Sequence, residues 1–240
     1  MLYFVKWVMK KQQRKVVNIY EPYETTLLSS LLKEGDTAID LGSSKGHYTF
    51  RFSNAVGETG EVFAFEPDPK HCNLVNSKLQ SHTPANIHLI QKAVSNKPGN
   101  GFLYLNLSNT GDHRIYDSGD NRYAIPIKTV RLDTFFLSYK KPIALIKMDI
   151  QGTELAALEG MASLLRRNPG VTIATEFWPF GLKTFGAEPL DYLATLQHLG
   201  FTLQIISEAS KKLEPVSAIQ SLITRYPPIS QRYTNLLCTR

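Results

Sequence analysis

The sequence predicts a single α/β domain built on a mostly parallel, doubly wound sheet. Three observations support this prediction. Short apolar runs alternate with amphipathic segments along most of the 240 residues. The run at 38–41 leads through two glycines into a helical segment, and the runs at 62–65 and 145–148 each end at an acidic residue. With 42% hydrophobic residues, the chain can bury one substantial core.

The segment DTAIDLGSSKGHYT at 36–49 is typical of a strand, a glycine turn and a helix start. Gly42 and Gly46 let backbone N–H groups approach a ligand because no Cβ blocks the way. The following helix start adds unpaired N–H donors. The next strand, at 62–65, ends in Glu66, a carboxylate suited to the two hydroxyls of a ribose. The candidate nucleoside-binding residues are Asp40, Gly42, Ser43, Gly46, Glu66 and Pro67.

Three other interpretations of this turn stay open. A dinucleotide-binding loop has the spacing G-x-G-x-x-G, but Ser44 replaces its middle glycine, which disfavours a dehydrogenase. The segment 42–46 also matches G-x-S-x-G, the nucleophile elbow of serine hydrolases, although no HGGG-type segment precedes it. The third interpretation is an ordinary strand-to-helix turn of small residues.

The positive charge of the chain is concentrated near its N-terminus. The formal net charge is +6, and the first twenty residues carry five basic side chains and no acidic one, which leaves the rest near +1. The charge therefore describes a basic leader rather than a nucleic-acid-binding surface. The basic side chains of the leader are Lys6, Lys10, Lys11, Arg14 and Lys15.

Residues 1–20 are predicted to be a basic, aromatic leader, and residues 21–240 a single domain. In the leader the apolar residues come before the basic ones, which is the wrong order for a secretory signal. No apolar stretch is long enough to span a membrane, although aromatics beside lysines suit a weak contact with a membrane surface. Cys72 and Cys238 form no C-x-x-C pair, which favours a reducing, cytoplasmic location.

The first half of the domain is predicted to alternate helices and strands. Leucines at 27, 28, 31 and 32 mark one buried face of a helix at 22–33, and the segment 69–80 has helical spacing. A third strand is predicted at 86–94. Its end, at Lys92 and Ala93, would border the base of the nucleoside through backbone contacts.

The alternation breaks at 101–136, where two extended segments flank a polar, glycine-containing loop. We expect an inserted β-hairpin whose loop covers the crevice. Asp112, His113 and Arg114 are its chemically capable residues, and the imidazole of His113 is a candidate base near neutral pH. The alternative is a solvated loop tip.

The segment 142–149 is predicted to be a buried fourth strand because its apolar run is nearly continuous. Asp149 ends this strand at the edge where ligands bind in such sheets. A helix with buried positions at 155, 158, 161 and 165 follows, with Thr153 as its N-cap. Glu154 is either a catalytic carboxylate or a residue that complements the helix dipole.

Three further strands are predicted at 171–176, 201–206 and 233–238, which gives a seven-stranded sheet with an antiparallel end. Glu176 ends the fifth strand, and Trp178 follows it beside further aromatics. They would form either a substrate-binding wall, for example against a sugar face, or a hydrophobic plug.

The order of these motifs resembles the class I S-adenosylmethionine-dependent methyltransferases, and within them the FkbM family. The resemblance covers about residues 20–206. It rests on YEPYET, GDTAIDLGSSKGHYT, VFAFEPDP, KAVSN, VRLDTFF, LIKMDIQGTE and TEFWP, which are specific in combination. It implies a Rossmann-like seven-stranded sheet, S-adenosylmethionine as methyl donor, and O-methylation of a hydroxyl on a sugar or secondary metabolite.

Carried over by position, the resemblance assigns the methionine end of the cofactor to Asp40, Gly42 and Gly46, and the ribose to Glu66. Asp149 would face the sulfonium. Ser43 and Ser44 replace the usual Ala-Asn, and Gln151 replaces the usual Glu before the glycine at 152. The second change removes a charge, so Asp149 and Glu154 would have to supply it.

The resemblance predicts direct displacement at the methyl carbon by a substrate oxygen, for which positioning can supply on the order of 7 to 11 kcal/mol. Asp149 and His113 are the candidate bases, and Glu154 or Glu176 could orient the acceptor or help hold a divalent cation that the sequence does not require. The rival interpretation is a non-catalytic nucleotide-binding accessory protein. A nucleic-acid methyltransferase is disfavoured because no Asn-Pro-Pro-aromatic segment follows the fourth strand.

Overall fold

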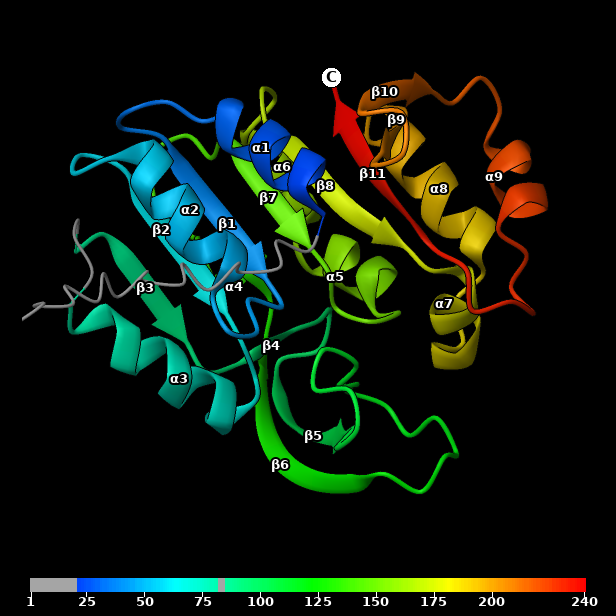
Figure 1. Cartoon of the computed structure of the whole chain (residues 1–240), viewed down its shortest axis with the longest axis horizontal. Coiled ribbons are helices and arrows are strands. Elements are labelled where there is room, and N and C mark those ends of the chain that lie inside the picture. The colour runs from blue at the N-terminus through cyan, green and yellow to red at the C-terminus, as the bar shows by residue number, and fades with distance from the viewer. Residues whose placement is uncertain (1–20, 82–84) are drawn as a thin grey trace, which may run out of the picture.

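The computed structural model describes residues 21–81 and 85–240, and its centre is an eight-stranded sheet in the order β10-β9-β11-β8-β7-β1-β2-β3 (Figure 1). The first five strands of this sheet along the chain pair in parallel, and β11 runs antiparallel to both of its neighbours. These pairings confirm the predicted mostly parallel sheet with an antiparallel end. The strands are β1 (Thr37–Leu41), β2 (Glu61–Phe65), β3 (Ile87–Ile90), β7 (Leu145–Met148), β8 (Thr172–Phe177), β9 (Thr202–Ser207), β10 (Lys212–Pro215) and β11 (Thr234–Thr239).

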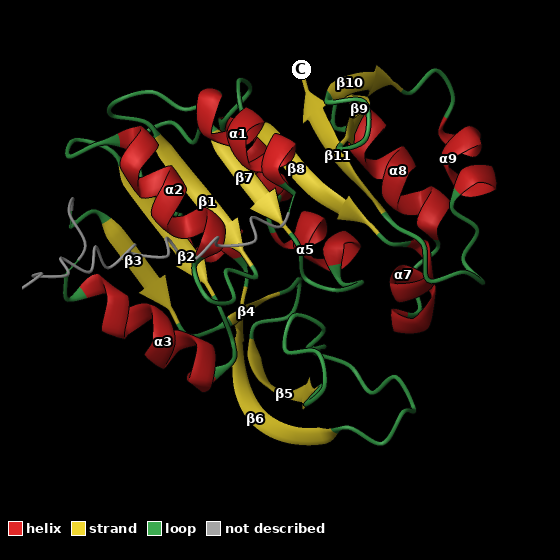
Figure 2. Ribbon diagram, viewed as in Figure 1, coloured by secondary structure: helices red, strands yellow, loops and turns green. Residues whose placement is uncertain are grey.

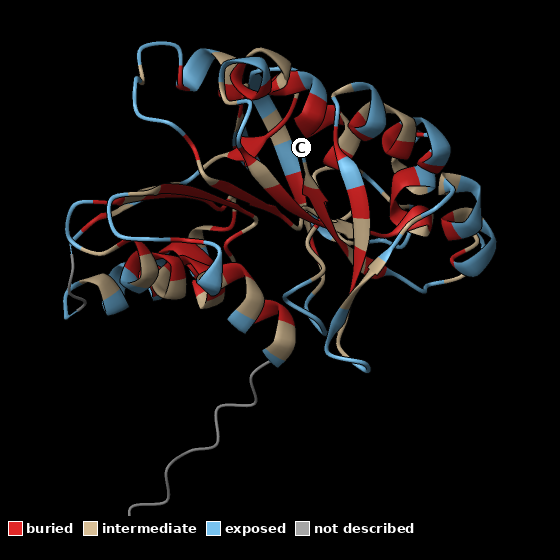
Figure 3. Cartoon of the chain, turned by 90° about the horizontal axis from the view of Figure 1, so that it is seen from above, coloured by how far each residue is buried: buried red, intermediate tan, exposed pale blue. Residues whose placement is uncertain are grey.

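Helices cover both faces of this sheet (Figure 2). One apolar cluster joins the sheet to α1 and α2, and a larger one joins the opposite face to α5, α6, α8 and α9. Figure 3 shows the buried residues as a band along the strands, between the two helical layers. The helices are α1 (Pro22–Ser30), α2 (His47–Val56), α3 (Pro69–Leu79), α4 (Leu132–Phe135), α5 (Glu154–Gly160), α6 (Ala162–Arg167), α7 (Pro179–Phe185), α8 (Pro189–His198) and α9 (Ile219–Arg225).

The two faces of the central strands follow from their alternating side chains. All five residues of β1 are buried, and Ala38 packs in the α1–α2 cluster while Ile39 packs in the larger one. Val62 and Phe63 divide in the same way on β2. Strands buried on both faces explain the nearly continuous apolar runs in the sequence.

The chain changes direction across the sheet between β1 and β7. It runs outward from β1 to β2 and β3, and then returns to form β7 on the other side of β1. Ligands of open α/β sheets bind at such a switch point, beyond the carboxyl ends of the strands. This topology predicts the location of the site before any side chain is considered.

A small second sheet lies beyond these carboxyl ends (Figure 1). It has the order β4-β6-β5, formed by β4 (Ala93–Val94), β5 (Gly99–Leu105) and β6 (Tyr123–Val130). The predicted hairpin is the antiparallel pair β5–β6. Two boundaries are wrong: the run at 86–94 divides between β3 and β4, and the segment after 130 forms the helix α4 rather than part of the hairpin.

Other expectations also need correction. The helix predicted at 22–33 ends at Ser30, and Leu31 is exposed, so only part of the predicted leucine stripe faces the core. The helix expected from Glu154 is broken at Met161 into α5 and α6. Next to the break, Gly160 lies against the backbone of Ser95, where a Cβ would be 2.5 Å from the carbonyl oxygen. The elements α7, β10 and α9 were not predicted. The leader predicted at 1–20 lies outside the described residues.

None of the helices formed by residues 21–81 and 85–240 combines the length and the apolar character that crossing a bilayer requires.

The turn after β1 gives the first testable prediction. Gly42 has φ +77°, and a Cβ there would lie 2.0 Å from the carbonyl oxygen of Asp149. We expect Gly42→Ala to lower the free energy of unfolding by roughly 3 kcal/mol, because backbone strain and overpacking add. Chemical denaturation measures this loss.

Gly119 provides a matched control, because its φ is +75° and nothing lies within 4 Å of the added Cβ. Gly119→Ala should therefore cost only about 1 kcal/mol, the price of the left-handed backbone alone. Equal losses in the two variants would contradict the close approach of the two turns.

Candidate cofactor and acceptor site

A pocket with about 560 Å³ of empty space, part of it open to solvent, lies at the switch point between the two sheets. Its polar side is formed by the turn after β1 and the end of β2, and its apolar side by side chains from β2, β4 and β5. This combination suits a nucleoside, which has a polar ribose and a flat, largely apolar base. The lining includes Gly42, Ser44, Phe65, Glu66, Pro67, His71, Lys92, Ala93, Val94, Leu103, His113, Ile115, Asp149 and Ile150.

Glu66 connects the two turns that form the polar side of this pocket. Its Oε2 accepts a hydrogen bond from the backbone N–H of Ser44 at 2.7 Å, and its Oε1 accepts one from Asp68 N–H at 2.8 Å. The side chain is buried at the end of β2, as predicted. A carboxylate fixed by two N–H donors keeps lone pairs available for the hydroxyls of a ribose.

The glycine turn follows the surface of the pocket through its backbone. Gly42 and Ser44 both have positive φ, and the N–H groups of Gly42 and Ser43 donate to the Phe65 carbonyl at 2.9 and 3.1 Å. These bonds hold the turn against the end of β2. The close approach of Gly42 to the Asp149 backbone leaves no room for a side chain there, so a ligand meets main chain on this side.

Two of the predicted cofactor residues support the turn from outside the pocket. Asp40 is buried, and its Oδ2 accepts a hydrogen bond from Thr49 Oγ1 at 2.6 Å, which ties β1 to α2. Gly46 is the N-cap of α2, with φ +82°, and a Cβ there would lie 2.7 Å from the Phe50 ring. Neither lines the pocket, so their part in binding a cofactor is indirect.

A larger cleft of about 1460 Å³ adjoins the first pocket. The two share Gly42, Ser44, Gly111, Asp149 and Gln151. Its other walls come from the N-terminal end of α1, from β8 and from the segment before β11. A ligand in the first pocket and a second ligand in the cleft would therefore meet beside Asp149.

Asp149 is held at this junction by two neighbours. Lys147 Nζ lies 3.2 Å from Asp149 Oδ2, and Gln151 Nε2 donates to Asp149 Oδ1 at 2.7 Å. Gln151 Nε2 also donates to Glu176 Oε2 at 3.2 Å. Gln151, which replaces the usual acidic residue at this position, therefore connects two carboxylates instead of adding a third.

Lys147 was not predicted to be part of the site. It is 5% exposed, and its Nζ lies 4.6 Å from the centre of the Tyr48 ring. Burial opposes its positive charge, but Asp149, Asp40 and Glu24 outweigh this effect and raise its pKa. The sequence signal was available, because Lys147 is the one charged residue inside the apolar run of β7.

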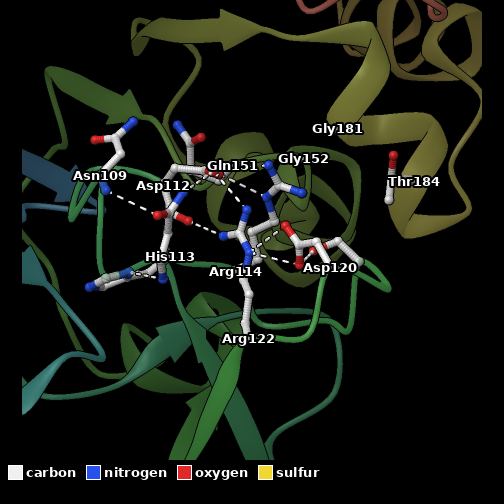
Figure 4. A network of polar contacts seen from close by, with 12 residues as sticks. Asn109, Asp112, His113, Arg114, Asp120, Arg122, Gln151, Gly152, Gly181 and Thr184 are labelled. Atoms are coloured by element: carbon white, nitrogen blue, oxygen red, sulfur yellow. Dashed lines mark hydrogen bonds and ion pairs between the residues drawn. The ribbon is translucent and has the colours of Figure 1, made fainter.

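The loop between β5 and β6 is held by ion pairs rather than left as a solvated tip. Arg114 Nε and Arg122 Nη2 each lie 2.8 Å from a carboxylate oxygen of Asp112 (Figure 4). Burial opposes the charge of Asp112, but hydrogen bonds from the two arginines prevail and lower its pKa. Tyr116 Oη donates to the Gln151 carbonyl at 3.1 Å, so the loop is fixed to the turn after β7.

Both ring nitrogens of His113 are occupied. Its Nδ1 accepts the backbone N–H of Asn106 at 3.0 Å, so the neutral ring carries its proton on Nε2, which lies 3.4 Å from Asp68 Oδ2. Burial lowers the pKa of His113. His113 lines the first pocket, but this arrangement leaves it no free nitrogen with which to accept a substrate proton.

The same contacts bear on a metal site. Among the described residues, only Asp68, His71 and His113 form a group whose ligand atoms lie within 4.8 Å of one another. A histidine that binds a metal through Nε2 normally donates a hydrogen bond from Nδ1. In His113, Nδ1 instead accepts a hydrogen bond from the Asn106 N–H. The three residues are therefore arranged as a hydrogen-bonded cluster rather than as a set of metal ligands.

Glu154 is fully buried and lines neither cavity. Its Oε1 accepts the N–H groups of Ile150 and Gly152 at 3.1 and 3.3 Å, and burial raises its pKa to about 7. The structure therefore favours the structural interpretation of Glu154 over the catalytic one. Thr153 is at the N-cap position, but its hydroxyl donates to the Ile150 carbonyl instead of capping α5.

The raised pKa of Glu154 predicts a pH-dependent stability. Between its ordinary value of 4.5 and about 7, the folded state holds a proton that the unfolded state has lost, so this contribution to stability falls as pH rises. Glu154→Gln removes the titration. Relative to the wild type, we expect this variant to gain on the order of 3 kcal/mol between pH 4 and pH 8.

Denaturation of both proteins at the two pH values tests this expectation. Glu159→Gln, five positions further along at an exposed site, is the control and should keep the pH dependence of the wild type. A constant difference between wild type and Glu154→Gln would show that folding does not shift the pKa of Glu154.

Trp178 is 6% exposed and contributes to the wall of the cleft. The Arg114 guanidinium lies 4.8 Å from the centre of its ring. Phe177, the last residue of β8, is fully buried, which favours the hydrophobic-plug interpretation over the substrate-binding wall. The segment serves mainly as the apolar plug, and only part of Trp178 reaches the cleft.

These features define a class of protein: a class I methyltransferase fold with a pocket at the switch point and a second cleft beside it. The profile of the methyltransferase FkbM domain matches residues 40–203, and the chain belongs to this family. S-adenosylmethionine is accordingly its methyl donor, and the first pocket fits it, because Glu66 faces the pocket and Gly42 leaves its backbone bare.

Solved structures share the fold. FkbM from Methylobacillus flagellatus is 15% identical with a TM-score of 0.53, over 90% of this chain and 48% of that one. A Streptococcus mutans protein in complex with S-adenosylhomocysteine (SAH) is 15% identical with a TM-score of 0.52, over 90% and 94%. An rRNA methylase from Streptococcus thermophilus is 14% identical with a TM-score of 0.50, over 90% and 93%. A search of curated proteins found no match.

Proposed function

We propose that this methyltransferase transfers the methyl group to a hydroxyl oxygen of a small molecule, such as a sugar or a secondary metabolite. The observation that carries the proposal is the junction at Asp149, which lines both the nucleoside pocket and the adjoining cleft. A carboxylate at this point is available to the hydroxyl of an acceptor that lies in the cleft. A hydroxyl acceptor needs a base to take its proton, and this carboxylate can do so. An acceptor that is already deprotonated would need no base.

Bound S-adenosylmethionine would supply an electrophilic methyl group next to a good leaving group. Glu66 and the turn at Gly42 and Ser44 would hold the nucleoside, while Lys92, Ala93 and Pro67 border its base. Asp149 would accept the hydroxyl proton as the acceptor oxygen attacks. Lys147 and Gln151 hold that carboxylate in position. Because the leaving group is already good, alignment of the cofactor and the acceptor would account for most of the rate enhancement.

The rival functions have less support. The serine hydrolase interpretation needs a histidine to activate Ser44, but the ring nitrogens of His47 contact Thr25 and Arg51, and those of His113 are occupied. A non-catalytic accessory protein would need no carboxylate between the two cavities. A small-molecule or glycan acceptor in a cytoplasmic setting agrees with the near-neutral charge of residues 21–240, which argues against nucleic acid.

Transfer of a labelled methyl group tests the proposal. The purified protein is incubated with methyl-labelled S-adenosylmethionine and a panel of free sugars, glycosides and polyhydroxylated metabolites, with RNA as a separate arm. We expect label on a small hydroxylated acceptor, in a linkage that resists alkali as an ether does. Label on RNA alone, or binding of the cofactor without transfer to any acceptor of the panel, would contradict the proposal.

A further inference from the structure

The cleft beside the first pocket, called the acceptor cleft below, has a small side cavity at its inner end. In this cavity, called the annexe, carboxylates outnumber basic groups. It lies between the start of α1 and strands β7, β8 and β11 and has about 270 Å³ of empty space, part of it open to solvent. Four acidic side chains line it, and Lys147 is the basic residue among them. The four acids are Glu21, Glu24, Asp149 and Glu176.

Most of these carboxylates are bound by neutral donors, which stabilise their position without cancelling their charge. Asn235 Nδ2 donates to Glu21 Oε1 at 2.8 Å and also to Glu24 Oε2. Gln151 Nε2 donates to Glu176 Oε2. Lys147 forms its ion pair with Asp149. Within residues 21–81 and 85–240, neither Glu21 nor Glu176 has an ion-pair partner.

The electrostatics agree with this deficit of positive charge. Burial raises the pKa of Glu21 and of Glu176, and Asp149 raises both further, although Lys147 acts in the opposite direction. Burial together with Glu21 raises the pKa of Glu24 to about 7. A cation that entered the annexe would favour the ionised forms of these acids and would add positive charge where Lys147 is the one basic lining residue.

An independent observation also points to a ligand here. Ser43 lines the same cleft and is 4% exposed, yet its hydroxyl oxygen has no hydrogen-bond partner among the described residues. A buried hydroxyl without a partner costs free energy, and an acceptor in the cleft would supply the missing bond.

We propose that the methyl acceptor carries a protonated amino group near its reacting hydroxyl, as an amino sugar does, and that Glu21 and Glu176 bind this ammonium in the annexe. Each offers one carboxylate oxygen that no described residue bonds; Glu21 is the N-cap residue of α1, and Glu176 belongs to β8. An ammonium has three N–H donors, enough to bond to both oxygens. This inference rests on the proposed function, because it names the acceptor class of the same site.

A divalent metal ion fits these residues less well. Hard cations bind where several carboxylate oxygens converge, and in the described part of the chain the only group of three ligand atoms within 4.8 Å is Asp68, His71 and His113. Lys147 would also repel an ion beside Asp149. An ammonium carries a single charge and needs no shell of converging oxygens.

Binding to the SAH-loaded protein tests the inference independently of turnover. Glucosamine and glucose form a matched pair of probes that differ by one amino group, and N-acetylglucosamine supplies a neutral amide. Ligand-observed NMR titration gives their relative affinities. We expect glucosamine to bind at least about ten-fold more tightly than either neutral sugar, because a desolvated charged hydrogen bond is strong.

Glu176→Gln and Glu21→Gln should each reduce this preference to about two-fold or less, while SAH binding shows that both variants are folded. Glu214→Gln, on β10 outside the cavities described above, is the matched control and should keep it. Equal binding of the sugars by the wild type, no binding of glucosamine, or a preference that survives both substitutions would overturn the inference. Failure of the wild type to bind SAH would instead contradict the proposed function.

Discussion

Glu66→Gln should weaken SAH binding by about 30-fold to 150-fold. The glutamine keeps the volume of the side chain, but only one of its terminal atoms accepts hydrogen bonds, whereas the N–H groups of Ser44 and Asp68 both point at this position. Loss of a charged acceptor at a buried site costs about 2 to 3 kcal/mol. The same substitution weakens the hydrogen-bond acceptor that the ribose hydroxyls would contact. It therefore disturbs both the turn that forms the pocket and the contact with the ligand.

Calorimetric titration of SAH measures this effect. Glu61→Gln is the matched control, because Glu61 begins the same strand at its other end and contacts Tyr139 and Lys141 instead. Its dissociation constant for SAH should stay within about two-fold of the wild type. A Glu66→Gln protein that binds SAH normally would show that the carboxylate is structural only.

Asp149→Asn should lower kcat by about 10²-fold to 10⁴-fold, the range that general bases contribute. The asparagine fits the same space, but it cannot take a proton, and it cannot form the ion pair with Lys147. SAH affinity should fall by less than about ten-fold, because Gly42, Ser44 and Glu66 are unchanged. A large effect on kcat with a small effect on cofactor binding is the signature of a group that acts on the acceptor.

The assay uses the acceptor that the labelled-methyl experiment identifies. Asp191→Asn, at an exposed position in the first turn of α8, controls for the chemistry of the substitution and should retain full activity. If Asp149→Asn keeps its kcat but loses SAH affinity, then Asp149 is a cofactor ligand and the base lies elsewhere.

The sequence predicted the fold and the location of the site because both depend on short-range patterns. Apolar runs of strand length identify the central strands, and an acid that follows such a run lies at the carboxyl edge of the sheet. Glu66 and Asp149 were predicted on this basis, and both line the first pocket. The split of the run at 86–94 between two sheets depends on tertiary pairing with β6, which no local pattern reveals.

The sequence could not show which way a polar side chain turns. Asp40 and Glu154 lie next to the predicted turns, but Asp40 bonds to Thr49 and Glu154 folds back onto its own turn. His113 reaches the pocket, yet the N–H of Asn106 fixes its tautomer. Each of these outcomes depends on one hydrogen bond to a partner that the spacing of residues does not specify.

The residues of the annexe were missed for a related reason. Glu21 and Glu24 belong to the segment YEPYET, which contributed to the family resemblance without a role for its acids. Their proximity to Lys147 and Glu176 results from α1 packing across the sheet to β11, where Asn235 bonds to both acids. Contacts over more than two hundred residues of sequence cannot be read from a single chain.

A crystal structure of the SAH complex tests the central claim most directly. The account predicts that the ribose hydroxyls contact Glu66, and that the sulfur faces the opening beside Asp149 into the acceptor cleft. The methyl group of the bound donor would then point at the acceptor. SAH bound in another cavity, or with its sulfur turned away from Asp149, would contradict the assignment of both the cofactor pocket and the acceptor cleft.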